Sequence, residues 1–217
     1  MNWPLLEGLG KEDRERVLAS TGKRRFVRHE VVFHQQDIGD DFHLVARGRL
    51  AIQVSTPHGD VVTIMVVGPG DFFGELALVE PGHRRNATVV ALEPAETFVL
   101  TGERFNELRQ AHPSVNRVLV EALAARLRRL TDVVVEALYY PVEVRLLRRL
   151  VEIADDWGWK NENGRLELTQ AELALMAGTT RPTVNRVLQK GAEQGILALG
   201  RGHVDILDFD RLRRLAD

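Results

Sequence analysis

The change of hydrophobic periodicity near residue 112 constrains the fold of this chain more than any other feature. Before this point, short β-branched and aromatic runs alternate with turns rich in Gly, Pro and Asp. After it, apolar side chains recur every three or four residues across 113–140, which is the spacing of one helix face. Pro141 ends this helix, because proline disfavours helical geometry in the preceding residue and lacks an amide hydrogen. We therefore expect a β-rich part, one long helix and a separate C-terminal part.

The β-rich part indicates a closed antiparallel barrel or a jelly roll. Its clearest strands are the runs 31–33, 42–45, 50–54 and 61–67. Short strands at this spacing are typical of folds that close a sheet or double it, because both arrangements protect the sheet edges. The sequence contains no cysteine, which excludes disulfide bonds and cysteine-ligated iron–sulfur clusters.

The long helix carries a heptad pattern along one face. A sustained pattern of this kind is typical of a coiled coil, in which a second helix covers the apolar face. We expect the helix to pair in parallel with its counterpart in a second copy of the chain. The alternative is a helix that packs against its own domain. Position a is occupied by Val120, Leu127 and Val134, and position d by Leu123, Leu130 and Ala137.

Gly74, Glu75 and Arg85 have the chemistry of a phosphate cradle. Gly74 allows backbone to approach a ligand closely, and a short helix beginning at Glu75 would point free N–H groups at an anion. Arg85 could return along the next strand and bind a phosphate oxygen through its guanidinium fork. Because a carboxylate repels phosphate, we expect Glu75 to meet a sugar hydroxyl and to be held by a cation. The alternative is a barrel corner in which Arg85 pairs with a local acid.

The C-terminal part contains the signals of a helix-turn-helix. Thr169 and Glu172 form a capping box, in which each side chain satisfies a free amide at the start of a helix. Gly178 lies where a left-handed turn would end this helix. Thr180 can cap a second helix whose first turn contains Pro182. A helix, a tight glycine turn and another helix place the second helix in the major groove of DNA.

The exposed face of that second helix and the hairpin after it supply candidate contacts to DNA. Arg181 and Arg186 can each bind the O6 and N7 acceptors of a guanine, and Asn185 lies on the same face. The glycine-rich hairpin at 196–207 indicates a wing whose Arg201 can touch a phosphate. The alternative is a helical hairpin with solvated arginines. The residues placed to bond phosphates and set the register are Thr169, Gln170, Thr180 and Thr183.

Gly-Glu-Leu-Ala-Leu at 74–78, followed by Arg-Asn-Ala-Thr at 85–88, resembles the phosphate-binding cassette of the cyclic-AMP receptor / fumarate-nitrate regulator family of bacterial transcription regulators. The resemblance extends over nearly the whole chain. It implies an α+β fold with an N-terminal antiparallel β jelly roll of the cyclic-nucleotide-binding type, a long dimerisation helix and a C-terminal winged helix-turn-helix. The expected domains are an effector domain at 1–112, the dimerisation helix at 113–140 and the DNA-binding domain at 141–217.

The same resemblance assigns roles to individual residues. Arg126 matches a helix arginine that supports Glu75, and Thr131 matches the polar position that reaches the base of the nucleotide held by the other subunit. Asn86 replaces the Ser or Thr usual in members that bind cyclic AMP, although Asn can still donate to a phosphate. Leu130 replaces a residue that is often polar. The residues implied to contact the phosphate and ribose are Gly74, Glu75, Leu76 and Arg85, and those implied to line the base pocket are Ile52, Ile64 and Ala87.

These features lead to one main functional prediction and two alternatives. We predict a cytoplasmic, homodimeric transcription regulator, not an enzyme, whose affinity for DNA is controlled by cyclic AMP bound in the jelly roll. Because Asn86 and Leu130 fall on ligand contacts, the first alternative is a regulator of the same family that acts without a ligand or with a different effector. The second is a jelly-roll metalloenzyme with an appended winged helix, although the seven histidines show no close HxH or HxxxH spacing.

The expected partners are double-stranded DNA with a pseudo-palindromic site, a second copy of the chain and, as a candidate, RNA polymerase. Pro182 stands where family members frequently carry a Glu that accepts from cytosine, so we predict altered or relaxed preference at that base pair. No resident cofactor, metal, iron–sulfur cluster or haem is expected. Neither a run of about 20 apolar residues nor a signal-peptide pattern is found, so no membrane partner is expected.

Overall fold

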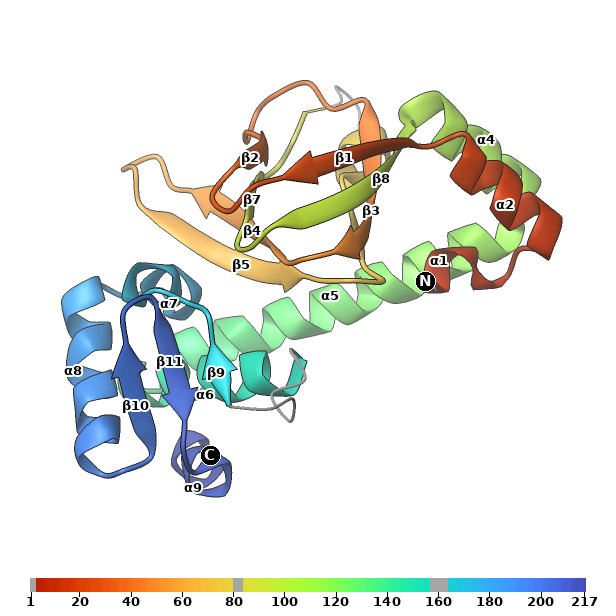
Figure 1. The fold of residues 1–217 in the computed structure, drawn as a ribbon. Coiled ribbons are helices and arrows are strands. Elements are labelled where there is room, and N and C mark those ends of the chain that lie inside the picture. The colour runs from red at the N-terminus through yellow and green to blue at the C-terminus, as the bar shows by residue number, and fades with distance from the viewer. Residues whose placement is uncertain (1–2, 80–83, 157–163) are drawn as a thin grey trace. The chain divides into compact units, whose positions relative to one another are not determined.

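The computed structural model describes residues 3–79, 84–156 and 164–217, and the chain forms two compact units, Met1–Arg129 and Leu130–Asp217 (Figure 1). The boundary between the units falls within the long helix, and the domain limits proposed at residues 112 and 140 remain predictions. Within the described ranges, no helix combines the length and the apolar character that a membrane crossing needs.

The first unit contains a jelly roll built from two four-stranded sheets. The strand order is β1-β8-β3-β6 in one sheet and β2-β7-β4-β5 in the other, and the neighbouring strands pair antiparallel. Two sheets that exchange strands in this way confirm the predicted fold. The strands are β1 Gly22–Phe26, β2 Val31–Phe33, β3 Asp41–Arg47, β4 Leu50–Ser55, β5 Val61–Val67, β6 Phe72–Phe73, β7 Thr88–Ala91 and β8 Ala95–Thr101.

Strand β3 is buried on both faces because it lies between two apolar cores. Phe42 and Leu44 belong to the cluster that the roll shares with the helices, whereas Val45 belongs to the cluster between the two sheets. Successive side chains of a strand point to opposite faces. Asp41 and His43 therefore share the inward face of Val45, which places a carboxylate and an imidazole inside the roll.

Helices α1, α2, α4 and the first part of α5 pack against the outer face of the β3 sheet. Trp3, Phe105, Val115 and Leu119 are buried in this cluster with the outward residues of β3. Trp3 also donates its indole N–H to the carbonyl oxygen of Val45 at 2.9 Å, which fixes the chain start to the sheet. The helices of this unit are α1 Pro4–Glu7, α2 Lys11–Ala19, α3 Glu75–Val79 and α4 Gly102–Ala111, and α5 spans Pro113–Tyr139 across the boundary between the units.

The second unit is a winged helix-turn-helix, as predicted. A three-stranded sheet of order β10-β11-β9 forms the wing, and α6 packs against α7 and α9. The sequence also predicts a helix over 142–157 and a loop over 158–164, and residue 157 of that helix and residues 158–163 of that loop lie outside the described residues. The elements are α6 Val142–Asp156, β9 Arg165–Leu166, α7 Gln170–Ala177, α8 Arg181–Glu193, β10 Leu197–Gly200, β11 His203–Ile206 and α9 Phe209–Ala216.

A cluster of charged groups joins the end of α5 to α6. Glu136 is buried on α5 and pairs with Arg149 and, at 3.4 Å, with Arg148 of α6. Arg148 also donates from Nε to the carbonyl oxygen of Ala216 at 2.7 Å, and its guanidinium carbon lies 3.9 Å from the centroid of the Tyr140 ring. The end of α5 is therefore tied to α6, and α6 to the end of α9.

Candidate phosphate cradle and nucleic-acid-binding face

The loop between β6 and α3 brings the candidate cradle together. Gly74 has a φ of +93°, a conformation that side chains other than glycine rarely adopt. A Cβ atom at this position would lie 2.8 Å from the carbonyl oxygen of Asp41 and 2.9 Å from Nη1 of Arg85. Glycine is therefore required by both the backbone and the close packing. Helix α3 begins at Glu75, as the sequence predicts.

Glu75 is buried, and only one of its carboxylate oxygens is paired. Arg126 of α5 donates from Nη1 to Oε1 of Glu75 at 2.6 Å and also hydrogen-bonds to the carbonyl oxygen of Phe72. Arg126 is the cation that the sequence argument required beside Glu75. The second oxygen, Oε2, is buried and has no hydrogen-bond partner among the described residues. Because an unpaired buried acceptor is costly, this position suits a ligand hydroxyl.

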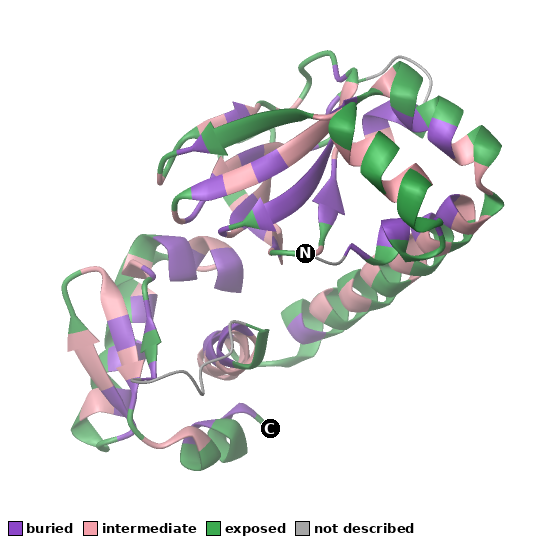
Figure 2. Ribbon diagram, turned by 45° about the vertical axis from the view of Figure 1, so that its right-hand side comes forward, coloured by how far each residue is buried: buried purple, intermediate pink, exposed green. Residues whose placement is uncertain are grey.

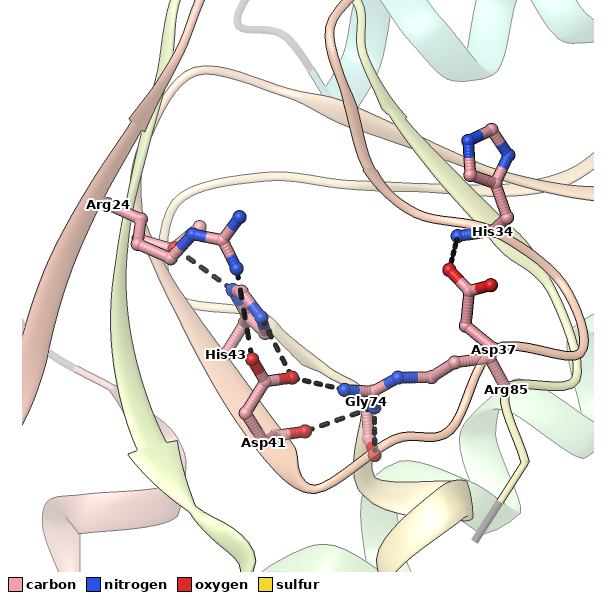
Figure 3. Close-up of polar contacts among 8 residues, drawn as sticks. Arg24, His34, Asp37, Asp41, His43, Gly74 and Arg85 are labelled. Atoms are coloured by element: carbon pink, nitrogen blue, oxygen red, sulfur yellow. Dashed lines mark hydrogen bonds and ion pairs between the residues drawn. The ribbon is translucent and has the colours of Figure 1, made fainter.

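Arg85 is 4% exposed and is held by acceptors from two segments of the chain (Figure 3). Nη1 donates to the carbonyl oxygens of Asp41 and Gly74, both at 3.0 Å, and Nη2 pairs with the Asp41 carboxylate. The guanidinium carbon lies 4.0 Å from the centroid of the Phe33 ring, and a Cβ at Gly39 would come within 2.4 Å of Nε. Nε itself is buried without a partner in the described part of the chain. Arg85 thus has a fixed orientation and one unused donor.

Asp41 is the centre of a chain of polar contacts that the sequence analysis missed. Its Oδ1 lies 3.3 Å from Nε2 of His43, and its Oδ2 lies 3.8 Å from Nη1 of Arg24. Nδ1 of His43 lies 3.1 Å from Oγ1 of Thr97 on β8. A signal was present, because Asp41 directly precedes the predicted strand 42–45 and residues separated by one position in a strand share a face. The alternative interpretation was a barrel corner in which Arg85 pairs with a local acid, and Asp41 is such an acid.

The surroundings of Asp41 and His43 shift both pKa values downward. Burial raises the pKa of Asp41, but the close contact and charge of His43 and the charges of Arg85 and Arg24 outweigh it and lower the pKa. Burial lowers the pKa of His43, because desolvation disfavours imidazolium more than Asp41 favours it. At neutral pH the site therefore holds an ionised Asp41 beside a neutral His43.

The other predicted ligand residues have mixed environments. Ile52 on β4 and Ile64 on β5 are half-buried, and Ile52 packs against the core between the sheets. Thr131 is exposed and belongs to the second unit, whereas the cradle belongs to the first. Of the residues near the cassette, Leu76 is half-buried, Asn86 is exposed and Ala87 is buried.

The predicted heptad face of α5 is mostly exposed (Figure 2). Leu127, at position a, has 67% of its surface exposed, which is unusual for a large apolar side chain. Leu123 differs, because it is half-buried against the core of the first unit. Exposed apolar residues that recur along one helix have the pattern that a helical partner covers in a coiled coil. The exposed heptad residues are Val120, Leu127, Leu130, Val134 and Ala137.

The helix-turn-helix is built by the local signals predicted from the sequence. Oγ1 of Thr169 accepts from the backbone N–H of Glu172 at 3.2 Å, and the Glu172 carboxylate accepts from the backbone N–H of Thr169 at 2.6 Å. Gly178 has a φ of +58° at the end of α7. Oγ1 of Thr180 then accepts from the N–H of Thr183 in the first turn of α8. The predicted capping box, glycine turn and cap are thus confirmed.

The outward face of α8 presents the predicted base-reading residues. Arg181, Asn185 and Arg186 are exposed. Gln170, at the start of α7, donates from Nε2 to Oδ1 of Asn185 at 3.1 Å and so ties the two helices together on this face. Pro182 is exposed in the first turn of α8 and has no side-chain hydrogen-bonding group. The inward residues of α8, Val184, Val187 and Leu188, are buried.

A groove of about 420 Å³ lies between the starts of α7 and α8 and the wing. Arg181, Arg201, Thr169 and Gln170 line it, and none of its lining residues is acidic. Two cationic groups with hydroxyl and amide donors suit the phosphates of a nucleic-acid backbone. The structure therefore brings predicted residues from both helices and the wing to one surface.

Two family profiles match this chain. The profile of the cyclic nucleotide-binding domain matches residues 23–112, which include the jelly-roll residues of the cradle. The profile of the Crp-like helix-turn-helix domain matches residues 144–215, which include both helices and the wing.

Individual known proteins are similar along most of the chain. The cyclic AMP receptor protein of Thermus thermophilus is 32% identical over 215 residues, covering 98% of this chain and 96% of that protein. The CRP-like cAMP-activated global transcriptional regulator of Mycobacterium tuberculosis is 30% identical over 195 residues, covering 88% and 86%. Among solved structures, the c-di-GMP responsive global regulator CLP of Xanthomonas campestris has a similar fold, with a TM-score of 0.79, 24% identity and coverage of 91% of this chain and 99% of that chain.

Proposed function

Because the chain belongs to the cyclic-AMP receptor / fumarate-nitrate regulator family of DNA-binding transcription regulators, we propose that it is a homodimer whose DNA affinity is controlled by a cyclic nucleotide. The jelly roll binds the nucleotide, and the winged unit binds DNA. Cyclic AMP is the proposed effector, since the relatives at 32% and 30% identity are named for it. RNA polymerase as a partner and the cytoplasm as the location are proposed from the family alone.

The observation that carries this proposal is a pair of unused polar atoms in the cradle. Oε2 of Glu75 is a buried acceptor and Nε of Arg85 is a buried donor, and neither has a partner among the residues described. A ribose hydroxyl can donate to the carboxylate, and a phosphate oxygen can accept from the guanidinium. A cyclic nucleotide carries both groups on adjoining rings, so one small molecule can satisfy both atoms.

The contact between Glu75 and Arg126 gives the nucleotide a route to the long helix. Arg126 belongs to α5, and its guanidinium joins Glu75 in the cradle to the carbonyl oxygen of Phe72. A hydroxyl that donates to Oε2 of Glu75 changes how strongly this carboxylate accepts from Arg126, and with it the hold of the cradle on α5. The effector controls DNA binding only if it binds one arrangement of the helices more tightly than the other.

The dimer and its DNA site follow from the exposed surfaces. The exposed heptad residues of α5 supply the dimer contact, which would remove Leu127 from water. A twofold dimer presents one α8 to each half-site, so the half-sites should be separated by about 34 Å, one turn of the DNA helix. A selection from random DNA, with and without nucleotide, would identify this site and show whether Pro182 relaxes one position.

Calorimetric titration of the purified protein with cyclic AMP, cyclic GMP and c-di-GMP tests the effector. We expect cyclic AMP to bind with one site per chain and to increase the affinity for the selected DNA. Binding of c-di-GMP alone would replace cyclic AMP as the effector. The absence of binding by all three nucleotides, with no gain in DNA affinity, would contradict the proposal.

A second candidate function is a regulator of this family that acts without a ligand or with another effector. The ion pair between Arg85 and Asp41 favours this second function, because the Asp41 carboxylate already pairs with the guanidinium that would bind the effector phosphate. Equal DNA affinity with and without every nucleotide would establish it. The metalloenzyme alternative has no such support: in the described ranges, no group of three or more His, Asp and Glu side chains is placed to hold a metal ion. Stoichiometric metal in the purified protein would reopen it.

A further inference from the structure

Arg85, the residue assigned to the effector phosphate, is already neutralised inside the protein. The Asp41 carboxylate pairs with Nη2, and the carbonyl oxygens of Asp41 and Gly74 accept from Nη1 (Figure 3). Because Arg85 is buried, water does little to screen this pair. An anionic effector must therefore compete with Asp41 for Arg85, unless the Asp41 carboxylate can pair with another group instead.

His43 lies close enough to Asp41 to become that other partner. Its Nε2 lies 3.3 Å from Oδ1 of Asp41, and its ring stacks on Phe73 with the centroids 4.6 Å apart. Nδ1 lies 3.1 Å from the hydroxyl of Thr97, which can donate to neutral imidazole or accept from imidazolium. Nδ1 can thus be hydrogen-bonded in both protonation states of the ring, whereas Nε2 lies near Asp41 but makes no hydrogen bond among the described residues.

The charged groups that face His43 come from three segments. Asp41 lies on its own strand, Arg24 comes from β1, and Arg85 comes from the segment that precedes β7. The two arginines disfavour a charge on His43, and Asp41 favours it. Thr97 and the rings of the neighbouring aromatic residues carry no charge. The protonation of His43 therefore depends on how strongly Asp41 pairs with Arg85.

We propose that Asp41 and His43 make effector binding at Arg85 a proton-coupled event. When the effector phosphate binds Arg85, the Asp41 carboxylate pairs with His43 instead, and His43 takes up one proton from the solvent. In the ligand-free protein Asp41 acts as an internal competitor that keeps Arg85 oriented. This inference rests on the proposed nucleotide-binding function and adds a determinant of affinity to the same site.

The expected pH dependence has a definite sign. Burial holds the pKa of His43 below its ordinary value of 6.5 in the ligand-free protein, so the ring is neutral at neutral pH. Neutralising Arg85 and freeing Asp41 both raise the pKa of His43 in the bound state. Because the bound state then holds more protons, affinity for the nucleotide increases as the pH falls through this range. A rise of one pKa unit corresponds to a tenfold gain, so we expect roughly a threefold to tenfold change.

The test is calorimetric titration of the full-length protein with cyclic AMP at about pH 5.5 and about pH 7.5, where histidine changes charge. Repeating each titration in two buffers with different ionisation enthalpies measures the number of protons taken up. We expect tighter binding and proton uptake toward acid pH in the wild type. Asp41→Asn keeps an oxygen acceptor for Arg85 but removes the competing charge, so it should bind more tightly at about pH 7.5 and show a weaker pH dependence, because only the neutralisation of Arg85 still raises the pKa of His43. His43→Gln should lose the pH dependence, because the group that takes up the proton is absent.

His34→Gln is the matched control, because His34 is an exposed histidine of the same jelly roll (Figure 3). It should retain the wild-type pH profile. Binding without proton uptake, or an Asp41→Asn variant that binds more weakly with the wild-type slope, overturns this inference while the proposed function stands. If no cyclic nucleotide binds at either pH, the proposed function fails and the inference fails with it. The wild-type proton count decides the question even if a variant does not fold.

Discussion

The two candidate sites differ in how their charged groups are held. In the jelly roll, Glu75 and Arg85 are 3% and 4% exposed, and their partners lie 51 and 44 residues away in the sequence. In the winged unit, Arg181, Arg186 and Arg201 are exposed, and short local elements position them. The cradle is therefore a network of mutually dependent buried groups, whereas the DNA-binding face is a set of separately presented ones.

This difference predicts how each site responds to substitution. A buried charge that loses its partner carries the full cost of desolvation, so a change in the cradle should affect both folding and binding. An exposed arginine loses only its own contact to DNA, so a change on the winged face should affect binding alone. The predictions below test this contrast, beginning with the largest expected effect.

Arg85→Leu should abolish nucleotide binding and destabilise the protein. The substitution leaves the half-buried Asp41 carboxylate without its main partner, and the loss of one partner of such a group costs about 1–3 kcal/mol of unfolding free energy. Arg84→Leu is the control, because Arg84 is exposed and donates only to a backbone carbonyl oxygen in the described contacts. Urea unfolding and nucleotide titration measure both effects. Wild-type nucleotide affinity in Arg85→Leu would show that the cradle is not the effector site.

Gly39→Ala should damage the cradle without removing any of its polar groups. The added Cβ would lie 2.4 Å from Nε and 2.6 Å from Cζ of Arg85, so the guanidinium must move. Overpacking of this kind costs about 1–3 kcal/mol, and we expect nucleotide affinity to fall by about tenfold or more. At Gly22 a Cβ would meet nothing within 4 Å, which makes Gly22→Ala the matched control. Equal nucleotide affinities in the two variants would refute this role of Gly39.

Arg181→Ala and Arg201→Ala should distinguish base reading from phosphate contact. Loss of a bidentate guanine contact at Arg181 should cost about 1–3 kcal/mol of DNA-binding free energy and relax one base position. Loss of the wing contact at Arg201 should weaken binding equally on all sequences and reduce the salt slope by about one. Neither change should alter the unfolding free energy. An equal loss on every sequence for Arg181→Ala would show that Arg181 contacts only phosphate.

His43 should make the unfolding free energy depend on pH, and this effect should be smaller than those of the substitutions above. Burial lowers the folded-state pKa of His43 below 6.5, so the unfolded chain binds more protons between these two values. His43 therefore reduces the unfolding free energy as the pH falls below 6.5, and His43→Gln removes this contribution. Urea unfolding at several pH values should give a shallower slope for His43→Gln than for the wild type. Parallel slopes would mean that His43 has an unshifted pKa.

Most of the fold and the DNA-binding face could be predicted because their signals are local. The capping box at Thr169 joins residues three positions apart, and Gly178 and Thr180 follow within eleven positions of it. The jelly roll was likewise visible in the alternation of short strands and turns. Such features are fixed by neighbouring residues and need no knowledge of distant contacts.

The internal connections of the cradle could not be predicted in the same way. Asp41 and Arg85 are 44 residues apart, and His43 and Thr97 are 54 residues apart, so their contacts depend on how the two sheets meet. In the sequence, His43 is one of seven histidines without metal-ligand spacing, and no local pattern links Gly39 to Arg85. The spacing of Asp41 and His43 indicates that they share a face of the strand. Only the pairing of the strands places that face beside Arg85.

The most direct test of the account is the affinity of the purified protein for its selected DNA site, measured by fluorescence anisotropy with and without cyclic AMP at one salt concentration. The account predicts that cyclic AMP increases this affinity in the wild type and has no effect in Arg85→Leu, whose affinity without nucleotide should match the wild type. Equal wild-type affinities with and without cyclic AMP would contradict the coupling of the jelly roll to DNA binding by this nucleotide.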